Sequence, residues 1–557
     1  MENLHFVVLD LFRASTCEPG VVVAGKKSSV PSYQYPETLP EQEIALASNP
    51  LLQRMQKARR EFDGDRHRPA FHYVNPESTL NDPNGLCFWQ GRWHLFYQGY
   101  PPEAVRTTPS LSGSLARVHW GHAISDDLVH WRDLPYAIYP DVEDCCFSGT
   151  TLVEANRVIA MYHGTEVGNM VATAGDPLLL NWSKVTGQPV IPVGKSGQKA
   201  DPDLPYTVFD PCIWKKGESY YALSAGTKPE GPARKPVRAN YLFRSPDLEH
   251  WEYLHPFVED DRFTHVGDDG ACPYFWPIGD RHILLFFSHM SGGQYLLGDY
   301  DTARDKFVVT QGGKFNHGAS LPSGLHAPSA TPDGNGGLIV IFNMNPGKPT
   351  SGWNQIMTLP WRLTVEGDEL HMEPAGDLSP LRQDHVSIGQ TTLPANEELV
   401  LTDVSGDALE LELELDAQTA PVVELNVLRS PGAEEYTRIS FYKERGFRGT
   451  RWNRPAGYPD QSVRSVISID TAHASTAADV RPRPPETAQL PLGADEPLRL
   501  RVFVDRSVVE VFANGRQCLA VRVYPERHDS VGVSLRSQGA PCTLMSMDAW
   551  QMKSIWA

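Results

Sequence analysis

The stretch Ser125–Trp131, Ser-Asp-Asp-Leu-Val-His-Trp, recurs further along the chain as Ser245–Trp251, Ser-Pro-Asp-Leu-Glu-His-Trp. A weaker copy, Asp176–Trp182, lies between the two. A pattern that recurs at roughly 50–70 residues is typical of propeller blades, each of which is a small antiparallel sheet. We expect the tryptophan of each copy to pack between neighbouring blades, a structural role that requires no function.

Short strand-like runs surround these repeats. Trp93–Gln98 is one example, and each such run follows a turn-like or polar stretch. About five units of this kind fit into residues 67–385, whereas residues 386–557 contain many short strand-like runs and no helix signal. Residues 1–66 are predicted to be an extension with one short helix within Glu41–Glu61. The sequence therefore predicts an all-β chain, a five-bladed β-propeller followed by a C-terminal β-sandwich.

The composition of the 557-residue chain narrows the class of partner. A formal net charge of −18 argues against nucleic acid or an anionic membrane as a partner and says little about a neutral sugar. The eight cysteines form no Cys-x-x-Cys pair and no zinc-like cluster, so we expect no metal site. No apolar run approaches the ~20 residues of a membrane span. Met1–Asp10 lacks a basic segment, so we expect no signal peptide, which slightly favours a cytoplasmic location.

Acidic residues open the strand-like runs of three different blades. Asp82 lies in the turn-forming run Thr79–Gly85, which follows strand-like Phe71–Val74. Taken alone, this run predicts a hairpin turn at the surface. Asp210 and Asp268–Asp269 precede later strand-like runs in the same way. Because tight turns lie at the ends of a propeller's channel, the three acidic turns can converge there, which indicates a site built from carboxyls.

Several motifs resemble those of glycoside hydrolase family 32, the invertases, inulinases and levanases. Asn81–Gly85, Asn-Asp-Pro-Asn-Gly, matches the nucleophile motif of that family. The resemblance covers about residues 68–557 in the family's order, with further matches at Phe96–Gln98, Trp120–Ala123, Asp127–Trp131, Phe147–Thr150 and Arg501–Phe512. It implies a five-bladed propeller plus a β-sandwich, which agrees with the prediction from the repeats.

The resemblance also implies an activity, the retaining hydrolysis of terminal β-fructofuranosidic bonds in sucrose, fructo-oligosaccharides or fructans, with fructosyl transfer to a sugar as an open alternative. Asp82 is then the nucleophile, ~5 Å from an acid of raised pKa, and Asp210 hydrogen-bonds sugar hydroxyls. No metal or organic cofactor is implied. For Trp120, packing between blades is an equal alternative to binding sugar. The residues implied to line the fructose site are Asn81, Gln98, Trp120, Phe147, Ser148 and Phe209.

Two positions depart from the family pattern. Phe209 stands where the family usually has Arg, and Ala271 stands where it has the Glu that serves as acid and base. Asp269 is two residues before Ala271 and points to the same face of an extended chain, whereas Asp268 points to the other face. Gly270 between them could allow a bulge that re-aims either side chain. We therefore predict an active enzyme that uses Asp269 in place of the missing Glu.

Three alternatives stay open beside this prediction. The chain could be a variant inactivated on purpose, although that leaves Phe209 unexplained. It could also be a non-catalytic protein that binds fructosides on the same scaffold. A different five-bladed glycosidase, such as an arabinofuranosidase, is disfavoured by the motifs Asn81–Gly85 and Asp505–Phe512.

Overall fold

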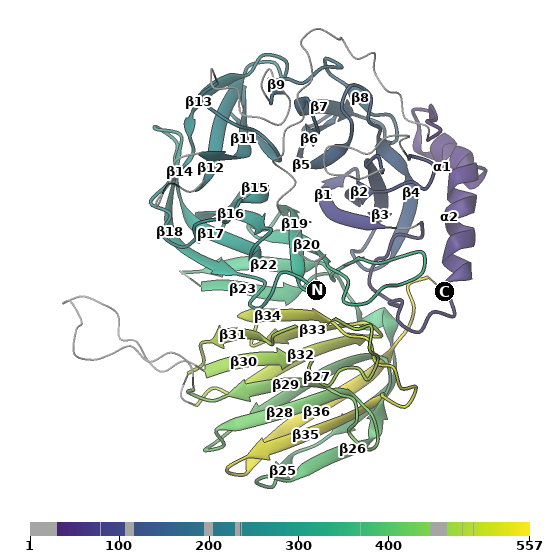
Figure 1. Cartoon of the computed structure of the whole chain (residues 1–557), viewed down its shortest axis with the longest axis vertical. Helices are drawn as coiled ribbons and strands as arrows, with labels where there is room; N and C mark the ends of the chain where they lie inside the picture. Colours follow the sequence, from purple (N-terminus) through teal and green to yellow (C-terminus); the bar gives the residue numbers. More distant parts are fainter. Residues whose placement is uncertain are drawn as a thin grey trace, which may run out of the picture.

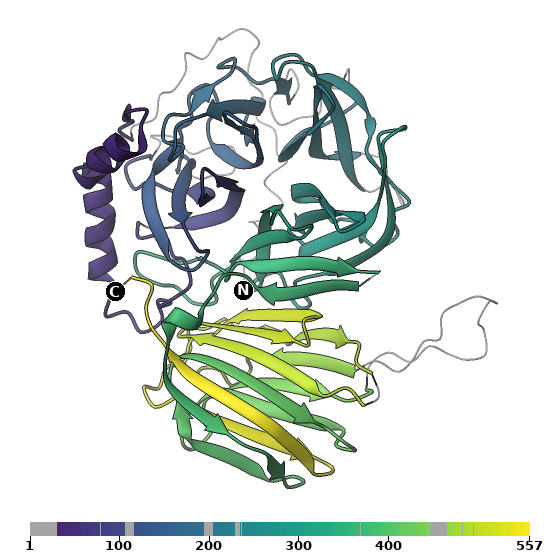
Figure 2. The same cartoon turned by 180° about the vertical axis from the view of Figure 1, so that it is seen from behind.

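A computed structural model shows a ring of sheets above a pair of packed sheets, with two helices along one flank of the ring (Figure 1). The view from behind shows the same arrangement (Figure 2). The prediction about a signal peptide concerns residues 1–10, which lie outside the described residues. The structure describes residues 30–77, 79–105, 116–193, 204–228, 234, 237–367, 369–445, 465–481, 483–493 and 495–556.

Five sheets form the ring in the described part of the chain. The first strand of each full blade contacts the first strand of the next, and the last of these contacts β1, which closes the ring. Every blade is antiparallel apart from the short parallel pairing of β14 with β18. The strands are β1 (Leu80–Trp89), β2 (Arg92–Gly99), β3 (His119–Ser125) and β4 (Trp131–Ile138); β5 (Cys146–Val153), β6 (Val158–Gly164), β7 (Gly168–Ala174), β8 (Ser183–Lys184) and β9 (Ile191–Pro192); β10 (Pro211–Lys216), β11 (Ser219–Lys228), β12 (Val237–Ser245) and β13 (Glu252–Pro256); β14 (Val258–Glu259), β15 (Ala271–Ile278), β16 (Arg281–Ser288), β17 (Gly292–Asp301) and β18 (Lys306–Lys314); and β19 (Leu325–Pro332), β20 (Leu338–Met344), β21 (Ile356–Met357), β22 (Trp361–Glu366) and β23 (Glu369–Pro374).

Two further sheets pack face to face after a short 3-10 helix, Ser379–Leu381. Their apolar faces share one core, which includes Leu411, Val502 and Val511. The first sheet contains β24 (Arg382–Ile388), β25 (Thr391–Leu393), β27 (Ala408–Asp416), β32 (Leu498–Asp505), β33 (Val508–Ala513), β34 (Gln517–Arg522) and β36 (Cys542–Met552), and the second contains β26 (Glu398–Ser405), β28 (Val422–Arg429), β29 (Thr437–Tyr442), β30 (Ser465–Asp470), β31 (Glu486–Leu490) and β35 (Gly532–Gln538). The prediction of a five-bladed propeller followed by a β-sandwich is confirmed.

The repeated motif forms the same turn in two blades. Ser125 Oγ accepts the N–H of Asp127 at 3.2 Å, and Asp127 Oδ1 accepts the N–H of His130 at 2.8 Å. The copy Ser245–Trp251 repeats both bonds, at 3.2 and 2.9 Å. Trp131 is buried in an apolar cluster of the propeller, as expected for a packing residue. The motif is therefore a structural turn, built by side chains that hydrogen-bond their own backbone.

The N-terminal extension holds two helices, α1 (Leu39–Ala47) and α2 (Pro50–Glu61), where the sequence predicted one. The break falls at Asn49, because a residue before proline is disfavoured in the helical conformation. Asn49 then caps α2, and its Oδ1 accepts the N–H groups of Leu51 and Leu52 at 2.9 and 3.2 Å. Pro50 suits the first helical position, since its missing N–H has no partner there.

A buried charged cluster joins the ring to the sandwich. His72 Nδ1 lies 2.8 Å from Asp505 Oδ2 and His72 Nε2 lies 3.1 Å from Glu510 Oε1, with all three side chains buried. Asp505 also accepts the backbone N–H groups of Phe71 and His72 at 2.8 and 3.0 Å. Phe71–Val74, predicted to be strand-like, is therefore irregular, because a carboxylate takes the place of a strand partner.

Candidate active site

The Asn81–Gly85 motif lies within β1, the first strand of the first blade, and Asp82 is buried there. Two register shifts interrupt the pairing of β1 with β2. Gly85 has a φ of +51°, and an added Cβ would lie 2.6 Å from Thr151 Cγ2. The prediction of a surface hairpin turn is wrong, because these turn-forming residues build the irregularities of a buried strand.

Three side chains from three other strands hold the Asp82 carboxyl. Gln98 Nε2 and Ser148 Oγ donate to Oδ2 at 3.0 and 2.7 Å, and His326 Nδ1 lies 3.0 Å from Oδ1. Burial by itself raises the pKa of Asp82, but the hydrogen bonds and charge of His326, together with Ser148, outweigh it and hold the pKa below its usual value. Asp82 is therefore an ionised, oriented carboxylate at neutral pH.

Asp210 lies directly before β10, beside Asp82. Its Oδ2 accepts the N–H of Cys272 at 3.0 Å. Cys272 Sγ lies 3.5 Å from Oδ2 of Asp210 and 3.5 Å from Oδ2 of Asp82, so the two carboxyls stand on either side of one sulfur atom. Burial raises the pKa of Asp210 to about 7; the N–H of Cys272 opposes this rise, and the charge of Asp82 adds to it. Two neighbouring carboxyls thus differ in protonation, as glycosidase sites require.

The two positions that depart from the family pattern contact one apolar cluster. Ala271 is the first residue of β15 and is buried with Cys272, Phe287 and Ala327, and Phe209 packs against this group. The methyl group of Ala271 can neither donate nor accept a proton. Because both departures replace a charged side chain by an apolar one in the same cluster, a single packing arrangement accounts for both.

Asp269 and Asp268 have different surroundings. Gly270, which separates them from the start of β15, bends the chain there, as the sequence suggested. Gly270 has a φ of +67°. Asp269 Oδ2 lies 2.5 Å from His289 Nδ1, and Asp269 Oδ1 accepts the backbone N–H of His289 at 3.1 Å. Asp268 is buried and accepts a hydrogen bond at 2.7 Å from the hydroxyl of Ser291, in the loop between β16 and β17. Asp269 is therefore paired with the imidazole of His289, whereas Asp268 has a structural role in holding the neighbouring loop.

Predicted sugar-binding residues form a polar network beside Asp82. Asn81 Nδ2 donates to Gln98 Oε1 at 3.1 Å, and Gln98 Nε2 donates to Ser148 Oγ at 2.8 Å. Asn81 Oδ1 accepts from Gln355 Nε2 at 2.9 Å and from Asn343 Nδ2 at 3.2 Å. Amides and hydroxyls that are fixed in this way offer the donors and acceptors that sugar hydroxyls need.

The aromatic residues predicted to line the sugar site, Trp120, Phe147 and Phe209, differ in how deeply they are buried. Trp120 has 0% exposure and donates its indole N–H to the backbone oxygen of Phe147 at 2.9 Å. It packs against Phe96 and Tyr162, with ring centroids 5.7 Å away in each case. Of the two open alternatives for Trp120, the structure therefore favours packing, since its indole is buried and is bonded to the backbone of Phe147. Phe147 itself is only partly buried, as is Phe209.

The structure brings four polar residues to this region that the predicted set of site residues does not include. They are His289, His326, Asn343 and Gln355. A positional signal existed for His326, because it is the second residue of β19 as Asn81 is of β1, and both strands belong to the closed inner ring. His289 follows the end of β16, and only the pairing of β16 with β15 brings it to Asp269.

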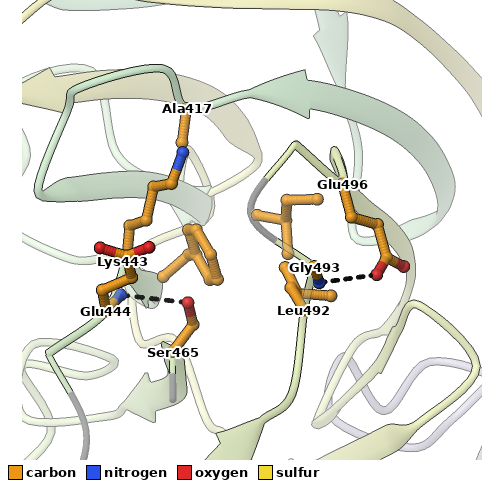
Figure 3. Close-up of a pocket in the computed structure, with 9 residues that line it drawn as sticks. Ala417, Lys443, Glu444, Ser465, Leu492, Gly493 and Glu496 are labelled. Carbon is orange, nitrogen blue, oxygen red and sulfur yellow. Dashed lines mark hydrogen bonds between the residues drawn. The ribbon is translucent and has the colours of Figure 1, made fainter. Parts of the chain in front are cut away.

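Other features lie outside this region. A hollow in the sandwich is lined by polar groups that already have partners (Figure 3): the N–H of Glu444 donates to Ser465 Oγ at 3.1 Å, and the N–H of Gly493 donates to Glu496 Oε2 at 3.0 Å. Within the described ranges, no group of three His, Cys, Asp or Glu side chains is arranged to hold a metal ion. No described helix has the length and apolar character needed to cross a membrane.

Two neighbouring carboxyls of unequal pKa, here at the starts of propeller strands, are the arrangement that glycoside hydrolases use. The chain belongs to glycosyl hydrolase family 32. The model of that family's N-terminal domain matches residues 72–374, and the model of its C-terminal domain matches residues 377–551.

Characterised relatives span nearly the whole chain. Levanase from Bacillus subtilis (strain 168) is 26% identical over 535 residues, covering 89% of this chain and 72% of the relative. Sucrose-6-phosphate hydrolase from Escherichia coli is 27% identical over 518 residues, covering 88% of this chain and 96% of the relative. The crystal structure of fructan 1-exohydrolase IIa from Cichorium intybus matches with a TM-score of 0.72 at 20% identity, covering 88% of this chain and 98% of that one, which establishes a shared fold.

Proposed function

We propose that this protein hydrolyses terminal β-fructofuranosidic bonds by a retaining double displacement. The observation that carries the proposal is Asp82, a buried carboxylate held by Gln98, Ser148 and His326 and flanked by the second carboxyl of Asp210. The relatives named levanase, sucrose-6-phosphate hydrolase and fructan 6-exohydrolase support a fructoside as the substrate class.

In this mechanism, Asp82 attacks the anomeric carbon of the fructosyl unit while the leaving oxygen takes up a proton. A covalent fructosyl ester of Asp82 forms, and water then releases fructose with the original configuration. The lowered pKa of Asp82 favours this role, because the attacking group must be ionised. Asp210 hydrogen-bonds sugar hydroxyls, and these bonds strengthen as positive charge develops on the ring.

The sugar unit that this site accepts is a terminal fructosyl group of sucrose, a fructo-oligosaccharide or a fructan. Asn81, Gln98 and Ser148 provide fixed donors and acceptors for its hydroxyls. When a sugar hydroxyl takes the place of water in the second step, the same chemistry transfers the fructosyl unit. The proton exchange falls to Asp269 and the imidazole that it contacts, since Ala271 has no titratable group.

The alternative is a non-catalytic protein that binds fructosides, and Ala271 is the observation that favours it. Release of fructose from sucrose, inulin and levan by the unmutated protein separates the two. We expect release by the unmutated protein, none by Asp82→Ala, and full release by Asp126→Ala, whose side chain is 81% exposed. Sugar binding without any release supports the binding protein, and release that survives Asp82→Ala contradicts the assigned nucleophile.

A further inference from the structure

A fructoside with a sugar leaving group needs a proton donor opposite its nucleophile, because an alkoxide leaves slowly without one. Ala271 provides no such group. Ala271 pairs with Phe287 in the antiparallel ladder of β15 and β16. Asp269, two residues before Ala271, meets His289, two residues after Phe287, just beyond the ends of the paired strands.

The contacts of Asp269 hold this imidazole in one orientation. Its Oδ2 lies 2.5 Å from His289 Nδ1, and its Oδ1 accepts the N–H of the His289 backbone at 3.1 Å. His289 Nε2 makes no hydrogen bond with any of the described residues, so this atom is available to a ligand. The His289 side chain is 51% exposed, whereas the Asp82 side chain is 11% exposed. Because a leaving group departs toward solvent, the more exposed His289 is better placed than a buried group to give it a proton.

His289 is close to the carboxyls of the site. Its ring lies 4.8 Å from the ring of Phe287, which in turn lies 3.7 Å from the ring of His326. The rings of His289 and His326 are 6.2 Å apart, and His326 Nδ1 is 3.0 Å from Asp82 Oδ1. His289 and His326 thus both pack against the ring of Phe287, and His326 in turn contacts Asp82.

The charges around His289 favour its protonated form. It is faced by Asp269 from the loop before β15, Asp82 from β1, Asp210 from the start of β10 and His326 from β19. Burial alone lowers the pKa of His289, but the hydrogen bond and charge of Asp269 and the charges of Asp82 and Asp210 raise it above its usual value. The nearby cation Arg238, which contacts Gly270, is paired with Asp261.

We propose that His289 is the acid and base of this fructosidase, with Asp269 as its positioning residue. This inference rests on the proposed function. In the first step, Asp82 forms a bond to the anomeric carbon, the bond to the leaving oxygen breaks, and that oxygen takes the proton from His289 Nε2. In the second step, neutral His289 takes a proton from water while the water oxygen bonds to the anomeric carbon and the electron pair of the ester returns to Asp82.

Asp269 and Asp210 are less suited to this role. Both oxygens of Asp269 contact His289, one at its backbone and one at its ring. Asp210 is buried, and its Oδ2 contacts both the N–H and the sulfur of Cys272. His289 is the titratable group of the three with a free nitrogen and a half-exposed ring.

The first test varies the leaving group. We expect His289→Gln to lose about 10²–10⁴-fold in kcat/KM on sucrose and to keep nearly the unmutated kcat/KM on 4-nitrophenyl β-fructofuranoside, because nitrophenolate needs no proton to leave. His250→Gln removes an imidazole from a similar Asp–His pair, with Nδ1 2.9 Å from Asp247 and 80% exposure, and we expect no change in either rate. Equal losses of His289→Gln on both substrates indicate a structural role and overturn the proposal.

The second test uses Asp269→Asn, which lowers the pKa of His289 by removing a negative charge. The acid form of His289 is then lost at a lower pH, so the basic limb of kcat/KM on sucrose moves to lower pH. Asp269→Glu, which restores the charge, moves the limb back. A basic limb that stays in place in Asp269→Asn contradicts the assignment even if His289→Gln fails to fold.

Azide supplies a third readout, because this anion attacks the fructosyl ester without a base. With 4-nitrophenyl β-fructofuranoside, whose first step needs no acid, we expect azide to accelerate turnover by His289→Gln and to yield fructosyl azide, and to leave the unmutated enzyme unchanged. An unmutated protein that releases no fructose contradicts the proposed function. An active unmutated protein beside a His289→Gln variant of equal activity on sucrose contradicts this inference alone.

Discussion

The Nδ1 atom of His326, on β19, lies 3.0 Å from Oδ1 of Asp82, whereas Gln98 on β2 and Ser148 on β5 donate to Oδ2. His326 lowers the pKa of Asp82 by its hydrogen bond and by its charge. A nucleophile with a lowered pKa is active above that pKa and inactive below it. We therefore expect the contact between His326 and Asp82 to set the pH below which kcat/KM falls.

Replacing His326 by Gln tests this relationship. The change removes the charge, so the pKa of Asp82 rises and the acidic limb of kcat/KM moves to higher pH. At neutral pH we expect a loss of about 10–100-fold, the range for one hydrogen bond to a charged group. An acidic limb that does not move in a pH profile of fructose release contradicts the role of His326.

Replacing Ser148 by Ala removes a different contact of the nucleophile. Its hydroxyl donates to Asp82 Oδ2 at 2.7 Å. We expect kcat/KM on sucrose to fall by about 10–100-fold, because a hydrogen bond to a charged, buried group is lost. Ser468→Ala removes a hydroxyl that lies 2.9 Å from Thr487 Oγ1 in the sandwich, and it should leave the kinetics unchanged. Similar losses in both variants, measured by initial rates, would point to a general effect on folding.

The fold could be predicted because its signals are local. The copies of the Ser125–Trp131 turn and the short apolar runs between them repeat along the chain. Each copy predicts a turn of one blade, and each apolar run predicts one of its strands. The nearness of Asp82 and Asp210 could be expected for the same reason, since each belongs to a contiguous motif at or just before the start of an innermost strand. A turn at Asn81 was the wrong expectation, because its amide finds hydrogen-bond partners on Gln98 and Gln355 inside the propeller.

The rest of the site depends on register and packing, which spacing along the chain does not reveal. Asp269 meets His289 because two strands pair with Ala271 opposite Phe287. Trp120 was an open choice between packing and binding, and its place beneath Phe147 decides for packing. Neither relation is visible as a sequence pattern, since each joins residues brought together by the folded sheets.

The cluster that joins the two domains predicts a stability that depends on pH. The pKa of His72 is raised to about 9: burial lowers it, and the hydrogen bonds and charges of Asp505 and Glu510 more than offset this. A raised histidine pKa contributes stability that is complete below the unfolded value of about 6.5 and is lost as pH rises through about 9. Thermal unfolding should therefore show a falling midpoint between neutral and alkaline pH.

The matching variant is Asp505→Asn, which leaves His72 with one acidic partner. We expect it to lower the free energy of unfolding by about 3–5 kcal/mol, as when a buried ion pair loses one member. Asp548→Asn breaks a pair in which His385 and Asp548 side chains are 50% and 37% exposed, and it should cost less than about 1 kcal/mol. Equal costs in denaturant titrations of the two variants would contradict the buried role of Asp505.

Gly85 tests the close packing beneath the nucleophile. Gly85 and Gly91 both have positive φ, +51° and +85°, but an added Cβ lies 2.6 Å from Thr151 Cγ2 at Gly85 and meets no atom within 4 Å at Gly91. Both alanine variants pay about 1–2 kcal/mol for the left-handed backbone. Gly85→Ala loses about 1–3 kcal/mol more by overpacking. Relief of that contact by a shift of β1 would move Asp82, so Gly85→Ala should also lower kcat on sucrose, whereas Gly91→Ala should keep it. Equal kcat values in the two variants would show that the side chain of Thr151 moves instead and leaves Asp82 in place.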